Sequence, residues 1–501
     1  MPEVPPLPQD SLRPGVALCV DLDGTLTKSD TLHDSLLALV RRHPGKIMQV
    51  PGWIAQGKAS FKRNVTRSVE LDVEHLPYNR PLLEWLRQEH GRGRAIYLAT
   101  AADKSLADRV AEYVGIFAGT LASDGEVNLA GSNKLAAFEK QFGKDGFCYI
   151  GNAKPDIKLL NACQSPMVAN PHGALTAGLR KAGTVPAASF EDRTPLVKSW
   201  LKAVRLHQWA KNVLIFVPML LGHQINLATF AGALTAFFSF GLCASATYII
   251  NDLLDIETDR RHPRKRRRPF AAGDLSMFAG FANVAVLFTL AILLAIALPR
   301  IVDAMPGPYI LTEPYAFLGW LGLYTVTTLT YSFYLKKKLL LDVFVLSGLY
   351  TVRILAGSAA TGVPISPWLA GFSVFFFLSL AFVKRFAELE SLRERGSSVT
   401  NGRGYFVSDL EQLRALGTGA AYASVVVMAV YISNPETALL YHHTVRLWLV
   451  VPVLLLWLSQ VWMLASRGEM HDDPVVWACT DKRSLLLGVL MAAVVIWAMW
   501  P

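Results

Sequence analysis

The sequence has few cysteines and few charges for its length. Its five cysteines among 501 residues are scattered, and no two have metal-ligand spacing, so we expect neither a disulfide framework nor a zinc site. Charged residues make up only 18% and hydrophobic residues 52%, with a mean hydropathy of +0.32. This balance is too apolar for a soluble protein and too charged for a membrane bundle throughout. We therefore expect a soluble part joined to a membrane part, and we exclude disorder as the main state.

The N-terminal part, residues 1–195, has the pattern of a soluble α/β domain. Its start, "MPEVPPLPQD", has no apolar core, so no signal peptide is expected. The runs "GVALCVDLDGT", "RAIYLATAAD" and "GFCYIGNAKPD" each resemble a buried strand followed by a helical stretch. This alternation predicts a doubly wound parallel sheet. Residues 196–210 then have the amphipathic pattern of a linker helix at the membrane interface.

Residues 211–501 contain long apolar segments that predict an all-α membrane domain. Most approach the roughly 20 residues that a bilayer requires. The connections at 260–268, 336–338, 384–414 and 467–483 hold nineteen Lys and Arg residues, whereas the opposite side holds only Arg300 and Arg446. This asymmetry predicts a cytoplasmic (inner) membrane protein whose N-terminal domain is cytoplasmic and whose C-terminus is outside. The nine predicted spans are 211–224, 228–250, 277–298, 313–331, 339–359, 364–384, 413–433, 445–465 and 484–500.

Two aspartates follow the first predicted strand, in Asp21-Leu22-Asp23-Gly24-Thr25. Carboxylates two residues apart point to the same side of a strand or of the turn that follows it. Such a pair can hold Mg²⁺ while Asp21 attacks phosphorus. Asp23 can then protonate the leaving oxygen and later activate water. The alternative is an aspartate pair that only caps a helix.

Four further polar residues follow in an order that suits a phosphate site. Thr100 could donate to a phosphate oxygen, and Lys134 could neutralise a phosphoryl group. Asn152 and Asp156, after a third strand, could complete the metal site. Each residue alone also fits a helix cap or a solvated helix start.

Together these residues resemble the haloacid dehalogenase (HAD) superfamily of phosphatases over about residues 15–185. The resemblance implies that Asp21 is the nucleophile, that Asp23 is the acid and base, and that Thr100 and Lys134 match the second and third motifs. Residues 30–95 look helical and would be the family's cap. The last motif usually has an acidic residue where this chain has Asn152, which leaves a catalytically inactive domain as an alternative.

A second acidic cluster lies at the cytoplasmic end of a predicted span. Asp252, Asp255 and Asp259 are three and four residues apart, so on a helix they share one face with Asn251 nearby. Three carboxylates near a membrane are costly, and divalent metal ions bound to a diphosphate would remove that cost. The alternative is a solvated face neutralised by the arginines that follow. In the basic run Arg264–Arg268, we assign Lys265 and Arg268 to phosphate binding and the rest to topology.

The NDxxDxxxD pattern followed by this arrangement of spans resembles the UbiA superfamily of intramembrane prenyltransferases over about residues 200–501. The resemblance implies that the aspartates bind a diphosphate through Mg²⁺. Aromatic prenyltransferases of that superfamily carry a second pair of aspartates in the later half, and here Asp342 has no acidic partner. An arginine inside a span, Arg353, is a candidate functional residue. The other polar residues offered for substrate binding are Lys211, Tyr331, Lys336, Lys384, Arg385 and Glu388.

Cations facing a metal–diphosphate site suit a second ligand that is itself a phosphate. The segments "RLHQWAKN", "YSFYLKKKLLLDV", "RILAG" and "KRFAEL" resemble the branch that acts on decaprenyl-type polyprenyl phosphates as phosphoribosyltransferases. The resemblance implies transfer of 5-phosphoribose from phosphoribosyl diphosphate (PRPP) to the lipid phosphate. The HAD-like domain would then remove the 5-phosphate and give polyprenyl-phosphoryl ribose for envelope biosynthesis.

Two other functions remain open at this point. One is an aromatic prenyltransferase that uses polyprenyl diphosphate, and the other is a membrane scaffold with an inactive phosphatase domain. The expected partners are PRPP, polyprenyl phosphate and the bilayer, with no nucleic acid. The sequence leaves homo-oligomerisation and the lipid chain length undecided.

Overall fold

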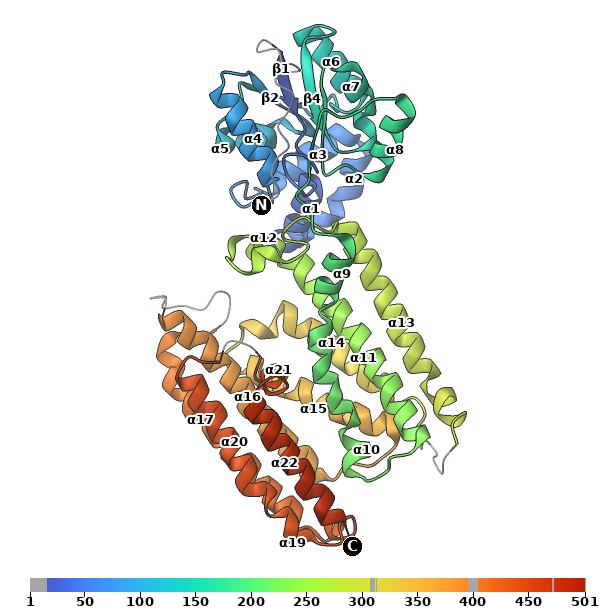
Figure 1. The fold of residues 1–501 in the computed structure, drawn as a ribbon, viewed down its shortest axis with the longest axis vertical. Coiled ribbons are helices and arrows are strands. Elements are labelled where there is room, and N and C mark those ends of the chain that lie inside the picture. The colour runs from blue at the N-terminus through green and yellow to red at the C-terminus, as the bar shows by residue number, and fades with distance from the viewer. Residues whose placement is uncertain (1–15, 307–310, 312, 395–403, 471–472, 501) are drawn as a thin grey trace. The chain divides into compact units, whose positions relative to one another are not determined.

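The computed structural model describes residues 16–306, 311, 313–394, 404–470 and 473–500 (Figure 1). The chain forms two compact units. The first unit comprises residues up to Val204 together with Ile249–Ala282, and the second comprises Arg205–Tyr248 together with the residues from Asn283 onward. The proline-rich start and part of the predicted basic connection at 384–414 lie outside the described residues. The predicted boundaries at 195 and 210 stay a prediction.

The first unit is built on a parallel sheet, which confirms the predicted α/β domain. The strands run in the order β3-β2-β1-β4-β5-β6, so the order reverses beside β1. Ligands of open parallel sheets bind at the carboxyl ends of the strands beside such a reversal. The strands are β1 Ala17–Val20, β2 Ile96–Asp103, β3 Gly119–Ser123, β4 Phe147–Gly151, β5 Pro166–Ala169 and β6 Ala188–Phe190.

Helices cover both faces of this sheet. Because successive residues of a strand point to opposite faces, Leu18 and Val20 join one hydrophobic cluster and Cys19 joins the other. The first cluster includes Trp85 of α4 and Val110 of α5. The helices are α1 Thr31–Arg42, α2 Val50–Ala55, α3 Lys58–Ser68, α4 Arg80–Gly91, α5 Lys104–Val114, α6 Ser132–Phe142, α7 Ile157–Ala162 and α8 Gly173–Ala182.

The second segment of the first unit, residues 249–282, packs against α1. It holds the end of α11 (Leu227–Leu254), α12 (Ile256–Arg261) and the start of α13 (Met277–Asp303). The Arg260 guanidinium donates to both carboxylate oxygens of Asp34, at 2.9 and 3.2 Å, and both side chains are buried. An outer pair joins Arg42 to Glu257. The acidic motif therefore belongs to the same compact unit as the α/β sheet.

A short helix, α9 (Leu196–Val204), lies in the predicted interfacial linker. Its Leu196, Val197 and Leu201 side chains are exposed. Lys198 and Lys202 lie on the same helix. An apolar exposed face bordered by lysines suits a helix that lies in a membrane interface.

The second unit is entirely helical. Its described residues include three hydrophobic clusters: one is centred on α16, α17 and α20, one on α11, α14 and α15, and a smaller one contains Leu369, Tyr431 and Leu447. A 3₁₀ segment, Leu206–Phe216, enters the unit and is followed by α10. The helices are α10 Val217–Leu221, α14 Ala316–Phe333, α15 Leu341–Thr361, α16 Pro367–Glu394, α17 Leu410–Ser433, α18 Pro435–Ala438, α19 Thr444–Leu447, α20 Val450–Ser466, α21 Pro474–Ala478 and α22 Lys482–Met499.

Seven helical segments among the described residues are long and apolar enough to cross a membrane. They correspond to seven of the nine predicted spans. The predicted span 211–224 instead forms the 3₁₀ segment and α10, because Pro218 begins a new short helix there. The predicted span 313–331 corresponds to α14, which is 18 residues long and is not among the seven. The chain is an integral membrane protein, and the number of nine spans and its orientation stay predictions.

We predict that Asp34→Asn destabilises the first unit. The substitution leaves the buried Arg260 guanidinium without its counter-charge, and breaking such a pair costs about 3–5 kcal/mol. The midpoint of thermal unfolding of the purified protein in detergent should fall. Arg42→Ala, which breaks the more exposed pair with Glu257, is the matched control and should cost at most about 1 kcal/mol. Equal midpoints for the two variants would contradict the assigned role of Asp34.

Candidate active sites

The first site lies where β1 ends, beside the reversal of strand order. The backbone N–H of Asp21 donates to the carbonyl of Ile150 on β4, at 3.1 Å, which fixes the residue at the sheet edge. The Lys134 ammonium donates to Asp21 Oδ1 at 2.7 Å, to the Ala99 carbonyl at 3.2 Å and to the Tyr149 hydroxyl at 3.1 Å. The structure thus brings together Asp21 and Lys134, two residues 113 positions apart.

Asp23 and Asn152 flank the turn that follows β1. Asp23 Oδ1 accepts from the backbone N–H of Thr31, at 2.7 Å. Gly24 has φ +76°, and a Cβ on it would lie 2.0 Å from Asn152 Nδ2. Glycine is therefore required both by the backbone conformation and by the close approach of the Asn152 side chain. The amide of Asn152 consequently lies directly over the aspartate turn.

Asp156 and Thr100 make local hydrogen bonds. Asp156 accepts from the Tyr149 hydroxyl at 2.8 Å and from the backbone N–H groups of Asn152 and Ala153, at 3.0 and 2.9 Å. Thr100 Oγ1 accepts from the Ala102 N–H at 3.0 Å, and the side chain is fully buried. Both residues stand beside the aspartate pair, and their predicted roles toward metal and phosphate stay predictions.

The buried carboxylates of this site are only partly neutralised by its lysines. Burial, followed by the neighbouring carboxylates, raises the pKa of Asp21 to about 7, although Lys134 acts in the opposite direction. Burial and the nearby Asp30 raise the pKa of Asp23 to about 6. Carboxylates destabilised in this way gain from a divalent cation, and Asp21, Asp23 and the Asn152 carbonyl are oxygen ligands of the kind that Mg²⁺ prefers. The residues present therefore fit a magnesium ion.

Lys62, on α3, is a polar residue of this site that sequence reasoning missed. Its ammonium donates to the Ala101 carbonyl at 2.7 Å and to Asn128 Oδ1 at 3.0 Å. It lines the same cavity of about 690 Å³ as Asp21 and Asp23. Its place in a helical insertion gave no motif signal. Only the packing of that insertion over the sheet edge brings the side chain in.

The acidic motif forms a second site in the same unit. One nitrogen of the Arg268 guanidinium donates to Asp252 Oδ1 at 3.1 Å and to Asp259 Oδ2 at 2.7 Å. Both carboxylates are buried, at 2% exposure. Asp255 lies at the break between α11 and α12, 3.9 Å from the Arg41 guanidinium. The carboxylates of Asp252 and Asp259 thus meet at one guanidinium, whereas α11 ends before Asp255, so the three aspartates do not lie on one continuous helix. Their oxygens are ligands of the kind that Mg²⁺ prefers, and the metal site stays a prediction.

The remaining members of this motif make fewer contacts. Asn251 is half-buried on the last turn of α11, and Lys265 is exposed in the 3₁₀ turn that follows α12. The predicted phosphate ligand Arg268 here neutralises the carboxylates. Its role toward phosphate stays a prediction. Arg260, which the sequence analysis counted only among the basic residues of the cytoplasmic side, holds Asp34 in a buried ion pair.

In the second unit, Asp473 gathers three predicted or neighbouring polar residues. Its Oδ2 accepts from the ammonium groups of Lys211 and Lys384, at 2.7 and 2.8 Å, and its Oδ1 accepts from the Tyr350 hydroxyl at 2.9 Å. Sequence reasoning brought forward both lysines and missed Asp473. The sequence signal that could have identified Asp473 is its position directly before Pro474, because an aspartate there can cap a helix. Asp473 is the N-cap of α21.

Arg353 is buried with neutral partners. Its guanidinium donates to Asn212 Oδ1 at 3.0 Å and to the Tyr324 hydroxyl at 3.1 Å, and it lies 4.8 Å from the centre of the Tyr324 ring. Among the described residues, no carboxylate lies within ion-pair distance of it. A buried cation that keeps its charge without a counter-ion is suited to an anionic ligand.

Asp342 and Arg385 form a separate ion pair, with Arg385 Nη2 2.6 Å from Asp342 Oδ2 and both side chains fully buried. Arg385 also contacts Glu388, and the Tyr405 hydroxyl donates to Asp342. Asp342 is therefore the partner of Arg385 and not of Arg353. Tyr331 and Lys336 are half-buried on α14 and in the turn after it.

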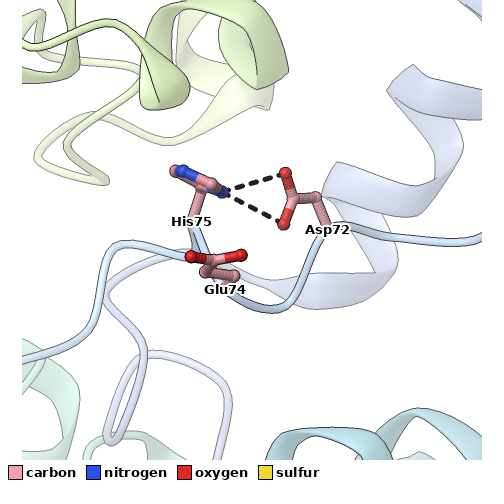
Figure 2. A group of neighbouring side chains, drawn as sticks. All are labelled: Asp72, Glu74 and His75. Atoms are coloured by element: carbon pink, nitrogen blue, oxygen red, sulfur yellow. Dashed lines mark hydrogen bonds and ion pairs between the residues drawn. The ribbon is translucent and has the colours of Figure 1, made fainter. Parts of the chain in front are cut away.

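A third acidic group lies in the first unit, at Asp72, Glu74 and His75 (Figure 2). Asp72 accepts from His75 Nδ1 at 3.1 Å and from Arg261 at 2.7 Å, and Glu74 is exposed. The arginine supplies the counter-charge that a metal ion would otherwise bring. This group is therefore best explained as part of the contact between the α/β domain and α12.

Comparisons with known proteins identify the family of the membrane part. The model of the UbiA prenyltransferase family matches residues 213–486. The uncharacterized protein y4nM of Sinorhizobium fredii is 37% identical over 490 residues, covering 96% of this chain and 91% of that protein. Decaprenyl-phosphate phosphoribosyltransferase of Mycobacterium tuberculosis is 33% identical over 236 residues, covering 46% of this chain and 72% of that protein.

Among solved structures, a UbiA homolog from Archaeoglobus fulgidus bound to GPP and Mg²⁺ aligns with 60% of this chain and 99% of its own, at 14% identity and a TM-score of 0.44. The family match spans more than half of this chain. It includes the Asp252, Asp255 and Asp259 motif and, of the cluster around Asp473, every member except Lys211. The chain belongs to the UbiA prenyltransferase family.

Proposed function

We propose that the membrane part transfers 5-phosphoribose from PRPP to a polyprenyl phosphate. The observation that carries this proposal is the convergence of Asp252 and Asp259 on a single cation, beside Asp255. The similarity to decaprenyl-phosphate phosphoribosyltransferases supports a lipid phosphate as the acceptor. The sequence around Asp342 lacks the second pair of aspartates of aromatic prenyltransferases, which supports the same choice.

In the proposed reaction, an oxygen of the lipid phosphate attacks C1 of the ribose. The bond between C1 and the diphosphate oxygen breaks, and diphosphate leaves. Mg²⁺ held by Asn251, Asp252, Asp255 and Asp259 would neutralise the leaving group. Arg268, which contacts Asp252 and Asp259, would supply a positive charge to the diphosphate.

Cations of the second unit would hold the other phosphates. Arg353 keeps a buried positive charge, and its neutral hydrogen bonds fix the direction of the guanidinium. Lys211 and Lys384 share one carboxylate, Asp473, so the three groups together carry a net positive charge. We assign the sugar 5-phosphate and the lipid phosphate to these residues together with Lys336. Lys265 of the first unit stays assigned to phosphate binding.

We propose further that the α/β domain is a phosphatase of the HAD type. Asp21 attacks the phosphorus of the 5-phosphate, the bond to the ribose oxygen breaks, and Asp23 donates a proton to that oxygen. Asp23 then takes a proton from water, which attacks the aspartyl-phosphate and releases inorganic phosphate. Lys134 holds the Asp21 carboxylate in place throughout. Mg²⁺ would offset phosphate charge at this site.

Both sites are proposed to lie on the cytoplasmic side of the inner membrane. The product would be polyprenyl-phosphoryl ribose, made without release of the phosphorylated intermediate. Covalent tethering raises the local concentration of the second site for the product of the first.

We predict that Asp252→Asn lowers ribosyl transfer by at least about tenfold at limiting Mg²⁺, because one charged ligand is lost. Transfer is measured as radiolabel passing from ribose-labelled PRPP to a polyprenyl phosphate in detergent. Asp303→Asn, outside the motif at the end of α13, is the matched control. Near-normal transfer by Asp252→Asn would contradict the assignment of Asp252 as a metal ligand.

We predict that Arg353→Ala lowers transfer by roughly ten- to a hundredfold, which corresponds to the loss of hydrogen bonds to a charged group. Arg353→Lys should recover part of the activity, since the charge returns without the planar fork. The kinetic constants for PRPP and for the lipid phosphate, measured separately, tell which substrate is held. A folded Arg353→Ala variant with parental kinetics for both would make Arg353 purely structural.

We predict that Asp21→Asn leaves transfer intact and changes only the product. An amide cannot form the aspartyl-phosphate, so lipid-linked ribose 5-phosphate should accumulate where the parent yields lipid-linked ribose. Mass spectrometry of the extracted lipid separates the two products. Identical products from parent and variant would mean that the α/β domain has another substrate or none.

A further inference from the structure

The cavity that holds Asp21 has one wall from outside the α/β fold. Asp21, Asp23 and Lys134 line one part of it. Trp200 of α9 and Phe270, from the segment that follows the acidic motif, line another. A cavity of about 690 Å³ exceeds what the phosphoryl group alone fills, so the remaining walls select the rest of the ligand.

This second wall is apolar and leads to a membrane helix. The rings of Trp200 and Phe270 meet edge to face, 6.3 Å apart. Met277 also lines the cavity and is the first residue of α13, one of the candidate membrane spans. With a free sugar phosphate bound, these apolar side chains would stay exposed to water, whereas a ligand with a hydrocarbon chain would bury them.

Arg193 brings a cation to the same cavity. Its guanidinium donates to the Lys28 carbonyl at 3.2 Å, and no described carboxylate lies within ion-pair distance of it. Lys28, by contrast, lies 3.4 Å from Asp274 and 3.8 Å from Asp192. Arg193 therefore offers a cation to an anion bound in this cavity, with Asp274 as a nearby negative charge.

We propose that this cavity binds a phosphomonoester carried on a membrane lipid, which rests on the proposed phosphatase function. The phosphomonoester meets Asp21, Arg193 binds a second phosphate that links the sugar to the lipid, and Trp200, Phe270 and Met277 cover the first part of the chain. The α/β domain thereby selects the lipid-linked substrate over soluble sugar phosphates.

The test compares three synthetic substrates with the full-length protein in detergent. These are ribose 5-phosphate, its methyl-phosphoryl derivative at C1 and its farnesyl-phosphoryl derivative at C1. Release of inorganic phosphate gives kcat/KM for each. The linking phosphate should raise kcat/KM by about tenfold through Arg193, and the farnesyl chain should raise it by about tenfold more, the effect of burying roughly two methylene groups.

Two variants test which part of the cavity causes each increase in kcat/KM. Arg193→Ala should remove the preference for methyl-phosphoryl ribose 5-phosphate over ribose 5-phosphate, and Arg193→Lys should restore part of it. Met277→Ser should reduce the preference for farnesyl over methyl. The matched controls are Arg180→Ala and Met48→Ser, both exposed and outside the cavity, which should keep the parental ratios.

Equal kcat/KM for all three substrates, or ratios that Arg193→Ala and Met277→Ser leave unchanged, would overturn the inference while the phosphatase stands. Phosphate release that is absent, or that survives Asp21→Asn, would overturn the phosphatase itself. Equilibrium binding of the same compounds to the Asp21→Asn protein separates these cases. A preference for the methyl-phosphoryl compound over ribose 5-phosphate that Arg193→Ala removes, and a preference for farnesyl over methyl that Met277→Ser reduces, support the lipid site without turnover. The absence of both preferences contradicts it.

Discussion

Counter-charge for buried carboxylates is the constraint on which the described structure depends. Asp21 has Lys134, Asp34 has Arg260, and the motif pair Asp252 and Asp259 share Arg268. In low dielectric an unpaired carboxylate is costly, so each pair fixes the elements that carry it. At Asp21 and Asp23 the nearby positive charge does not offset burial, so the pKa of each carboxyl group rises toward 7. A divalent ion bound there would stabilise both carboxylates.

The sequence predicted the parts of these sites that follow from local geometry. Strand ends of a parallel sheet meet at one edge, so Asp21, Thr100 and Asn152 could be placed together from their positions after apolar runs. The spacing of Asp252, Asp255 and Asp259 predicted a shared face in the same way, and Asp252 and Asp259 do meet at one guanidinium, although α11 ends before Asp255. Seven predicted spans correspond to helices, because a run of about twenty apolar residues in a bilayer can satisfy its backbone hydrogen bonds within a single helix. The segment 211–224 failed this reasoning, since Pro218 divides it.

What the sequence could not predict depends on packing between distant segments. Asp473 lies in a short connection and matters only because three helical segments bring Lys211, Lys384 and Tyr350 to it. Arg260 was counted only among the basic residues that predict the cytoplasmic side, because a basic run after a span has that role in most membrane proteins. Its pair with Asp34 appears only when α1 packs against α12. That contact also joins the acidic motif to the α/β domain in one compact unit. The two parts of the fusion are therefore packed together as well as covalently linked.

The central claim is that two reactions occur in sequence on one lipid. The most direct measurement uses PRPP labelled with ³H in the ribose and ³²P in the 5-phosphate, incubated with the purified protein, Mg²⁺ and a polyprenyl phosphate. The account predicts that both labels enter the lipid together and that ³²P then leaves as inorganic phosphate while ³H stays. Release of ³²P from PRPP before any ³H reaches the lipid, or lipid that keeps both labels indefinitely, would contradict it.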